Sequence, residues 1–251
     1  MPVHPPVFDF HLHYFAKDAG NLKVITDLLD KGSVEGILCC TDLYVNPPDA
    51  VAVNKPLFQA ASHYGRKKLP LLATVHPSMS GWKDTLLSML DMSPEIVGLK
   101  LHPPVGHYKV TLKAVSEVFE IAAKRNLLIA SHTCLVPGQS AIAFLPLLEH
   151  FSEVKFIIYH ASTHEESAYL SMRKNVYVEP TWLGFFKPVF DMVGKLAGYG
   201  KLLAGTDGPR WFASFPGDPY NDLAGLAAKM LPGEAEVRSF LYENAAQLLD
   251  L

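Results

Sequence analysis

The chain has 251 residues, of which 49% are hydrophobic and 19% are charged, and this composition excludes a disordered or low-complexity protein. Its net charge of -3 lacks the positive excess that binding to nucleic acid or to an anionic membrane requires. The three cysteines, Cys39, Cys40 and Cys134, fit neither a disulfide framework nor a zinc knuckle. We therefore expect a soluble, cytoplasmic protein whose partner is a small molecule, with no nucleic acid and no membrane involved. The sequence leaves open whether the chain forms a homo-oligomer.

Eight short apolar runs alternate with segments of helical periodicity along the chain. The runs occupy residues 7–13, 34–40, 69–76, 96–102, 127–132, 155–160, 175–180 and 201–207. The segments between them carry apolar residues at steps of three and four, as amphipathic helices do. Continuous apolar strands joined by helical crossovers require a parallel sheet that is covered on both faces. The pattern therefore predicts an α/β fold of eight strands.

The number of repeats and the chain length distinguish two folds of this class. An open doubly wound sheet and a closed (β/α)8 barrel both satisfy the pattern, but eight repeats in about 250 residues are typical of the barrel. No glycine-rich phosphate turn follows the first run, as a dinucleotide-binding fold would need. We predict a single (β/α)8 TIM-barrel domain over residues 1–251. The last helical segment, after Gly233, is expected to pack on the outside of that barrel.

Polar side chains stand at the ends of five of the predicted strands. They are His11 and His13 on the first strand, Lys100 and His102 on the fourth, His132 on the fifth, His160 on the sixth and Asp207 on the eighth. A barrel brings the carboxyl ends of its strands to one rim, where barrel enzymes build their sites. Clustered imidazoles with a carboxylate suit zinc and similar divalent metals. A lone histidine at a strand end is more often structural, but the joint pattern predicts a metal site.

The first strand, VFDFHLH, places its two histidines one residue apart. Because alternate residues of a strand share a face, we expect His11 and His13 on the inward face, with Asp9 deeper on the same face. Asp9 is then expected to hold a ligand or a backbone group in place. The opposite face is expected to carry Phe8, Phe10 and Leu12.

Several of these stretches resemble the amidohydrolase superfamily of metal-dependent (β/α)8 hydrolases. The resemblance rests on FDFHLH, GLKLHPP, IASHT, IIYHAS, LLAGTDGPRW and YENAAQLL, and it spans nearly the whole chain. It points to the compact amidohydrolase-related branch, also called amidohydrolase 2. The resemblance implies that His11, His13, His132 and Asp207 are metal ligands. It also implies that His160 is either a ligand of a second metal or a group that moves protons and polarises the substrate.

Lys100 bears on the number of metals. The phosphotriesterase-like members of the superfamily carry a carbamylated lysine on the fourth strand that bridges two metals. Alternatively, Lys100 stays an ammonium that binds a substrate carboxylate, or it reaches out to solvent. Because GLKLHPP resembles the mononuclear branch, we expect one divalent metal, zinc before others, and two only if Lys100 is carbamylated. His102 is the other residue of this strand that is expected to bind substrate.

The resemblance and the ligand pattern together predict a metal-dependent hydrolase. Metal-bound hydroxide is expected to cleave an amide, a cyclic amide, or a lactone or ester bond of a small molecule. Asp207 is expected to act as the proton acceptor, and His160 to stabilise the oxyanion or to join the metal shell. Arg210 and Trp182 are further expected substrate contacts, because a guanidinium group can bind a carboxylate in a bidentate way and an aromatic ring can wall a pocket.

Three other functions fit part of the pattern. Some members of the same branch resemble decarboxylases that hold a carboxylated substrate at this type of site. TatD-like deoxyribonucleases share the strand pattern but have glutamate where this chain has Lys100, and their substrate calls for a basic surface. A non-catalytic barrel that binds a metabolite is the third alternative, and the complete ligand set argues against it.

Overall fold

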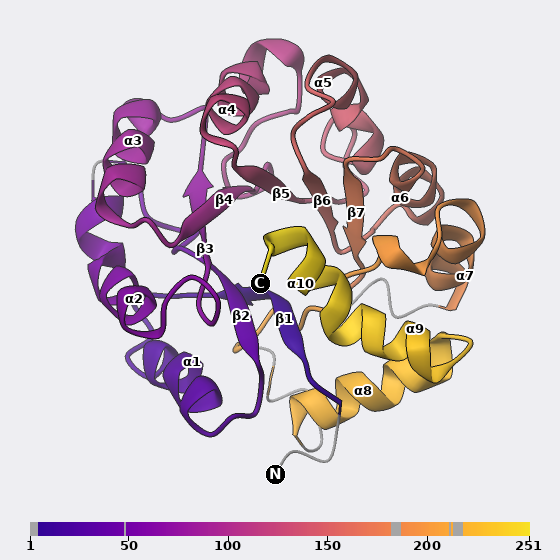
Figure 1. Ribbon diagram of the computed structural model, residues 1–251. Coiled ribbons are helices and arrows are strands. Elements are labelled where there is room, and N and C mark those ends of the chain that lie inside the picture. The colour runs from indigo at the N-terminus through magenta and orange to yellow at the C-terminus, as the bar shows by residue number, and fades with distance from the viewer. Residues whose placement is uncertain (1–4, 48, 182–186, 211, 213–217) are drawn as a thin grey trace.

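The protein forms a curled parallel sheet surrounded by helices in the computed structural model, which describes residues 5–47, 49–181, 187–210, 212 and 218–251 (Figure 1). The strands are β1 (Phe8–His13), β2 (Gly36–Cys40), β3 (Leu71–Val75), β4 (Ile96–Leu101), β5 (Leu128–His132), β6 (Phe156–Tyr159) and β7 (Val176–Glu179). They are paired in chain order, each parallel to the next. The first seven predicted strands are therefore confirmed, and their ends agree with the prediction to within about two residues.

Helices fill the crossovers between the strands and lie outside the ring of strands (Figure 1). They are α1 (Asn21–Asp30), α2 (Ala50–Tyr64), α3 (Trp82–Met92), α4 (Leu112–Arg125), α5 (Leu145–His150), α6 (His164–Ser171) and α7 (Lys187–Leu196). Further helices follow towards the C-terminus, namely α8 (Pro219–Met230), α9 (Glu234–Arg238) and α10 (Asn244–Leu249). In the described part of the chain, no helix combines the length and the apolar character that crossing a membrane would take.

Helix α4 shows why the sequence folds in this way locally. The Thr111 hydroxyl accepts a hydrogen bond from the Ala114 N–H and caps the first turn. Asn126 follows the last turn in the left-handed conformation, which asparagine adopts more readily than most residues. Between these caps, the buried stripe recurs at steps of three and four, as an amphipathic helix on a sheet requires. The stripe consists of Val115, Val118, Phe119 and Ala122.

Helix α10 does not pack on the outside, and that prediction was wrong. It lies over the centre of the ring of strands in Figure 1. Its side chains Ala245, Leu248 and Leu249 join the apolar cluster inside the ring. They meet that cluster at residues such as Phe8 and Leu128, where the strands begin, and they cover apolar surface that would otherwise contact water. The helix therefore closes the amino-terminal end of the ring.

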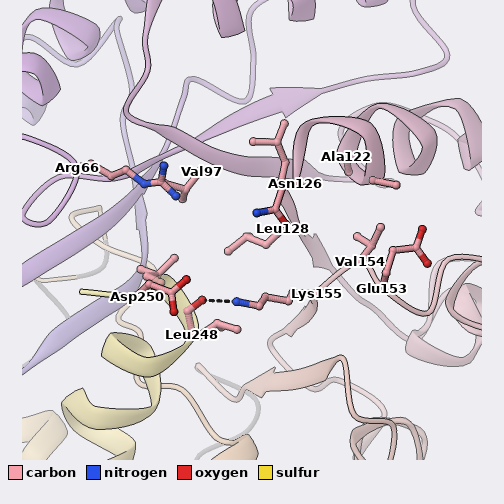
Figure 2. Close-up of a pocket in the computed structure, with 13 residues that line it drawn as sticks. Arg66, Val97, Ala122, Asn126, Leu128, Glu153, Val154, Lys155, Leu248 and Asp250 are labelled. Atoms are coloured by element: carbon pink, nitrogen blue, oxygen red, sulfur yellow. Dashed lines mark hydrogen bonds between the residues drawn. The ribbon is translucent and has the colours of Figure 1, made fainter.

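A shallow cavity lies beside this closure. Its volume is about 130 Å³, and it lies between the starts of β4 and β5, the end of α4 and the C-terminal residues (Figure 2). Lys155 crosses it and donates a hydrogen bond to the Leu248 carbonyl at 2.8 Å. Arg66, Lys155 and Asp250 are exposed there. No histidine lines this cavity among the described residues, so the predicted chemistry belongs to the opposite end of the ring.

Residues 202–208, which we call the closing segment, occupy the place of the predicted eighth strand. The Leu203 N–H donates to the Val178 carbonyl of β7 at 2.9 Å. On the other side, the Phe10 N–H donates to the Ala204 carbonyl at 2.8 Å. The closing segment thus lies between β7 and β1 and is hydrogen-bonded to both.

The closing segment is nevertheless not a regular strand, so the prediction of a strand over 201–207 was wrong. The Ala204 N–H donates to the carbonyl of Phe240 at 3.2 Å, and the Thr206 N–H donates to the Asp9 carboxylate at 3.0 Å. Asp207 has a positive φ of 55°, outside the strand region. Because these N–H groups turn to partners outside the ladder, the segment forms only isolated bridges with its neighbours.

A bulge in β1 corrects the prediction about its two faces. Asp9 pairs with Ile37 but Leu12 pairs with Cys39, so β1 has one extra residue against β2. As a result, two consecutive residues face the inside of the ring: Phe10 joins the inner apolar cluster, and His11 contacts Tyr159 of that cluster. Asp9 instead accepts a hydrogen bond from Tyr220 of α8 at 3.0 Å, outside the ring. Phe8 also belongs to the inner cluster, so the predicted faces were wrong for Phe8, Asp9 and Phe10.

Candidate metal centre

Three predicted ligands converge at the carboxyl ends of the strands. The Nε2 atoms of His11 and His13 lie 3.0 Å apart. The Oδ1 atom of Asp207 lies 3.3 Å from His11 Nε2 and 3.1 Å from His13 Nε2. Both imidazoles are buried, whereas the Asp207 side chain is 15% exposed. The bulge in β1 and the turn of the closing segment at Asp207 bring these atoms together.

His160, His132 and His102 continue from this group as a row of rings in contact, of which only His132 and His102 are stacked. The His160 ring lies 5.0 Å from that of His11, the His132 ring 4.4 Å from that of His160, and the His102 ring 4.1 Å from that of His132, between centroids. Among the described residues, the potential ligand atoms that lie within 4.8 Å of one another are those of His11, His13 and Asp207. The structure therefore places His132 and His160 beside the group rather than within it.

A cavity of about 200 Å³ opens over these residues. It is lined by His13, Phe15, Leu43, Tyr44, His102, His132, His160, Asp207 and Arg210. Arg210 lies with its guanidinium carbon 3.7 Å from the centroid of the Phe15 ring and 5.7 Å from that of Tyr44. Trp182, the other predicted substrate contact, lies outside the described residues. The cavity is small enough to select small molecules.

Lys100 is fully buried behind the ligand group, so the reading in which it reaches solvent was wrong. Its Nζ atom lies 3.2 Å from His11 Nε2 and 3.8 Å from the centroid of the Tyr159 ring. Burial lowers the pKa of Lys100, and the neighbouring Cys40, Asp207 and Glu179 act in the opposite direction. The described residues that line the cavity do not include Lys100.

Two residues that hold His11 were missed in the sequence. Glu179 Oε2 lies 2.7 Å from His11 Nδ1, and both side chains are fully buried. The Tyr159 ring stacks on the His11 ring at 3.7 Å between centroids. Glu179 is the last residue of β7, in NVYVEP, and an acidic residue at the carboxyl end of a barrel strand is a signal that could have indicated it.

Three of the four histidines expected at the metal centre have the protonation state that a metal needs, and His13 is the exception. Burial lowers the pKa of His11 well below its usual value, and nearby cationic groups add to the effect. Burial likewise lowers the pKa of His132 to about 2 and that of His160 to about 4. These imidazoles are therefore neutral at pH 7, and neutral imidazole is the form that binds a metal.

His13 and Asp207 form the charged pair of the group. For His13, burial acts to lower the pKa, but Cys40 and Asp207 together outweigh it and raise the pKa to about 9. For Asp207, burial acts to raise the pKa, but the hydrogen bond and charge of His13 prevail and lower it. Asp207 is therefore ionised at neutral pH, and a cation that binds here displaces the proton of His13.

The donor set fits a divalent metal ion. Two imidazole nitrogens and one carboxylate oxygen are a three-ligand set typical of catalytic zinc sites, which keep one position open. The contact of Glu179 with His11 is the kind of support that ligand histidines receive in such sites.

Solved structures of low sequence identity share the fold. They include a dihydroorotase from Campylobacter jejuni, with a TM-score of 0.67 and 19% identity over 99% of this chain and 84% of that one. A 2,6-dihydroxybenzoate decarboxylase from Rhizobium has a TM-score of 0.67 and 11% identity, over 98% and 99% of the two chains. A 5-carboxyvanillate decarboxylase from Sphingomonas paucimobilis has a TM-score of 0.63 and 11% identity, also over 98% and 99%.

Sequence comparison identifies the protein family to which the chain belongs. A search of curated protein sequences returned no match. The family model described as Amidohydrolase matches residues 54–251, which is more than half of the chain. The matched range contains His132, His160 and Asp207, whereas His11 and His13 precede it. The chain therefore belongs to the amidohydrolase family of enzymes.

Proposed function

We propose that the protein is a metal-dependent hydrolase that cleaves an amide, a cyclic amide, or a lactone or ester bond of a small molecule. The observation that carries this proposal is the convergence of His11 Nε2, His13 Nε2 and Asp207 Oδ1 beside a small cavity. These three residues would hold one divalent metal, zinc before others, and His132 would complete the set. When bound, such a metal polarises a carbonyl group and makes water more acidic. We count the closing segment as the eighth element of a (β/α)8 barrel.

Asp207 is the proposed proton acceptor. Its carboxylate is ionised, borders the cavity and is partly exposed, so a water molecule can reach it. It takes a proton from water as the water attacks the carbonyl carbon. It then returns that proton to the leaving nitrogen or oxygen, as a general acid–base group does.

His160 is the second proposed group of the reaction. Its Nδ1 lies 3.4 Å from the Thr181 carbonyl, which only accepts hydrogen bonds, so Nδ1 carries the proton of the neutral ring. Nε2 is then a lone-pair nitrogen. This tautomer supports a role as a proton acceptor or a metal ligand more than a role as hydrogen-bond donor to an oxyanion.

The position of Arg210 at the cavity favours a substrate that carries a carboxylate. Within the described residues its guanidinium group packs against the rings of Phe15 and Tyr44 rather than against a carboxylate. Asp207 is the one acidic residue among the described residues that line the cavity. A guanidinium group at the cavity can present parallel N–H donors to a planar carboxylate. We therefore propose a small carboxylic acid as substrate, with His102 as a further contact beside it.

The first test assays the zinc-loaded protein on N-acyl amino acids, carboxylated cyclic amides and carboxylated lactones. Asp207→Asn is expected to lower kcat by about 10²-fold or more, because the proton acceptor is lost. Asp91→Asn, at an exposed site on α3, serves as the matched control. Full activity of Asp207→Asn on a substrate that the wild type hydrolyses would contradict the assignment.

The substrate carboxylate is tested with Arg210→Gln. KM for the carboxylated substrate is expected to rise by about tenfold or more, since a charge-assisted contact is lost, whereas KM for its neutral carboxamide analogue stays unchanged. Arg66→Gln, in the cavity at the opposite end, is the control. An equal KM change for both substrates would mean that Arg210 does not recognise the carboxylate.

Decarboxylation is the second candidate, and the position of Arg210 at the cavity favours it as well, because a decarboxylase must also hold a carboxylate. Two of the solved structures that share the fold are described as decarboxylases. The two reactions differ in their products, since only hydrolysis incorporates oxygen from water and only decarboxylation releases CO₂. Release of CO₂ from a carboxylated substrate, with no labelled oxygen from water in the organic product, would mean that the protein is a decarboxylase.

A further inference from the structure

We propose that Glu179 is a positioning residue that fixes His11 in the tautomer protonated at Nδ1 and so directs the Nε2 lone pair toward the metal. The inference rests on the proposed metal-dependent function. It concerns a residue of β7 that contributes no ligand atom to the candidate metal centre.

The hydrogen bonds of Glu179 leave one carboxylate oxygen for His11. Its Oε1 atom accepts from the Thr181 N–H at 2.8 Å and also from the Thr181 hydroxyl group. Its Oε2 atom lies 2.7 Å from His11 Nδ1. The carbonyl oxygen of a carboxylic acid accepts two donors as readily as a carboxylate oxygen does, and burial raises the pKa of Glu179. The neighbours of Nε2 on the other side of the ring therefore decide where the proton of this contact lies.

The opposite side of the imidazole requires the tautomer protonated at Nδ1. Lys100 Nζ lies 3.2 Å from His11 Nε2. An ammonium group donates hydrogen bonds and accepts none, so Nε2 must supply the lone pair. The donor at Nε2 therefore puts the ring proton on Nδ1, where Glu179 Oε2 accepts it, and the Asp207 Oδ1 atom 3.3 Å from Nε2 takes its hydrogen bond from His13. A divalent cation takes the place of that donor when it binds the Nε2 lone pair.

The packing around His11 keeps the ring in this orientation. The Tyr159 ring stacks on it, and the Tyr159 hydroxyl group is anchored by donation to the Phe10 carbonyl at 2.7 Å. On another side, the closing segment passes so closely that a Cβ atom at Gly205 would lie 2.7 Å from His11 Cβ and 2.8 Å from Glu179 Oε1. The contact of His11 with Glu179 thus depends on a glycine at position 205.

Glutamine at position 179 cannot reproduce these contacts. If its amide oxygen accepts from His11 Nδ1, its NH₂ group faces the N–H and hydroxyl donors of Thr181. If the oxygen instead faces Thr181, the NH₂ group donates to Nδ1 and moves the ring proton to Nε2, where it blocks the metal. Support of this kind for a ligand histidine is typically worth about 10- to 100-fold in metal affinity.

The experiment compares wild type, Glu179→Gln and Glu166→Gln. Glu166 is the matched control, because its carboxylate accepts from the Ile142 N–H and the Thr163 hydroxyl group, away from the metal centre. Zinc affinity is measured by competition with a chelator, and the environment of the metal by the visible spectrum of the cobalt-loaded protein. Nitrogen-15 NMR of histidine-labelled protein, with and without zinc, reports which ring nitrogen of His11 carries the proton.

We expect Nδ1 of His11 to be protonated in the wild type both with and without zinc. Glu179→Gln is expected to weaken zinc binding by about tenfold or more and to change the cobalt spectrum, while Glu166→Gln leaves both unchanged. A folded Glu179→Gln protein with zinc affinity within about twofold of wild type would overturn the proposal. So would a wild-type His11 protonated at Nε2 before zinc is added, a result that needs no variant. A wild type that binds no zinc but has the expected tautomer would count against the metal-dependent function and not against the role of Glu179.

Discussion

The buried carboxyl group of Asp9 makes the stability of the protein depend on pH in a predictable direction. Asp9 is fully buried between β1, the closing segment and α8, and it accepts hydrogen bonds from the N–H groups of His11 and Thr206 and from the hydroxyl groups of Thr206 and Tyr220. Burial raises the pKa of Asp9 from 3.8 to about 6, although all four hydrogen bonds act to lower it. The folded state thus prefers the protonated acid. The stability that the protonated Asp9 contributes is complete below the pKa of 3.8 in the unfolded chain, and it is lost as the pH rises through the pKa of about 6 in the folded protein.

The size of the effect follows from the difference between the two pKa values. The rise of the pKa from 3.8 to about 6 corresponds to roughly 3 kcal/mol of unfolding free energy. About half of it is lost between about pH 5 and about pH 7.5. The assay is urea unfolding of metal-free wild type and Asp9→Asn across this range. Asparagine does not titrate, so the stability of wild type relative to the variant is expected to fall by about 1.5 kcal/mol as the pH rises.

The comparison between the two proteins cancels the groups that they share. Asparagine cannot accept all four hydrogen bonds, so it shifts the stability by a constant amount, and only the dependence on pH tests the reasoning. The exposed Asp91→Asn variant is expected to differ from wild type by the same amount at every pH. A difference between wild type and Asp9→Asn that is also independent of pH, or that grows with rising pH, would refute a raised pKa for Asp9.

Three further predictions concern packing and the metal centre. Gly205→Ala is expected to lower the free energy of unfolding by about 1–3 kcal/mol, because the new Cβ atom would overlap His11. In the control variant Gly225→Ala, in α8, the new Cβ atom has no neighbour within 4 Å, and the free energy of unfolding is expected to rise by up to about 1 kcal/mol. Leu248→Ala in α10 is expected to lower the free energy of unfolding by about 2–5 kcal/mol, because it opens a cavity. Leu196→Ala, at a half-exposed site, is expected to lower it by less. Equal losses of stability in denaturant unfolding would contradict the closing role of α10. Removal of zinc with a chelator is expected to lower the Tm of wild type but not that of His11→Ala, and calorimetry that shows no change in either protein would contradict metal binding at this site.

The strands were predictable because each is an apolar run with its own boundaries. Their order and parallel direction then followed from the helical crossovers between them. The closing segment could not be predicted in the same way, because its apolar letters, KLLAGTD, look like another strand. What prevents a regular strand is the Asp9 carboxylate and the Phe240 carbonyl, which take N–H groups of the segment and lie far away in the sequence.

Three of the predicted ligand residues lie together in the structure, and the sequence indicated them for a similar reason. The pair His11 and His13 stands out as a motif, and Asp207 ends an apolar run, so both could be identified from local sequence. The bulge in β1 depends on pairing with β2 and leaves no local sign, so the faces of Phe8, Asp9 and Phe10 were predicted wrongly. Glu179 was missed because its partner is 168 residues away and only the curled sheet brings the two together.

The irregular closing segment also has a mechanical consequence. The ring of strands has a seam where the ladder of hydrogen bonds is interrupted, and the candidate ligands lie on both sides of it, with His11 and His13 on β1 and Asp207 on the closing segment. An ion held by all three would connect the two sides of this interrupted part of the ring. Local opening there would separate the ligands before the rest of the sheet is disturbed, so loss of the ion and loosening of the ring are expected to be one event.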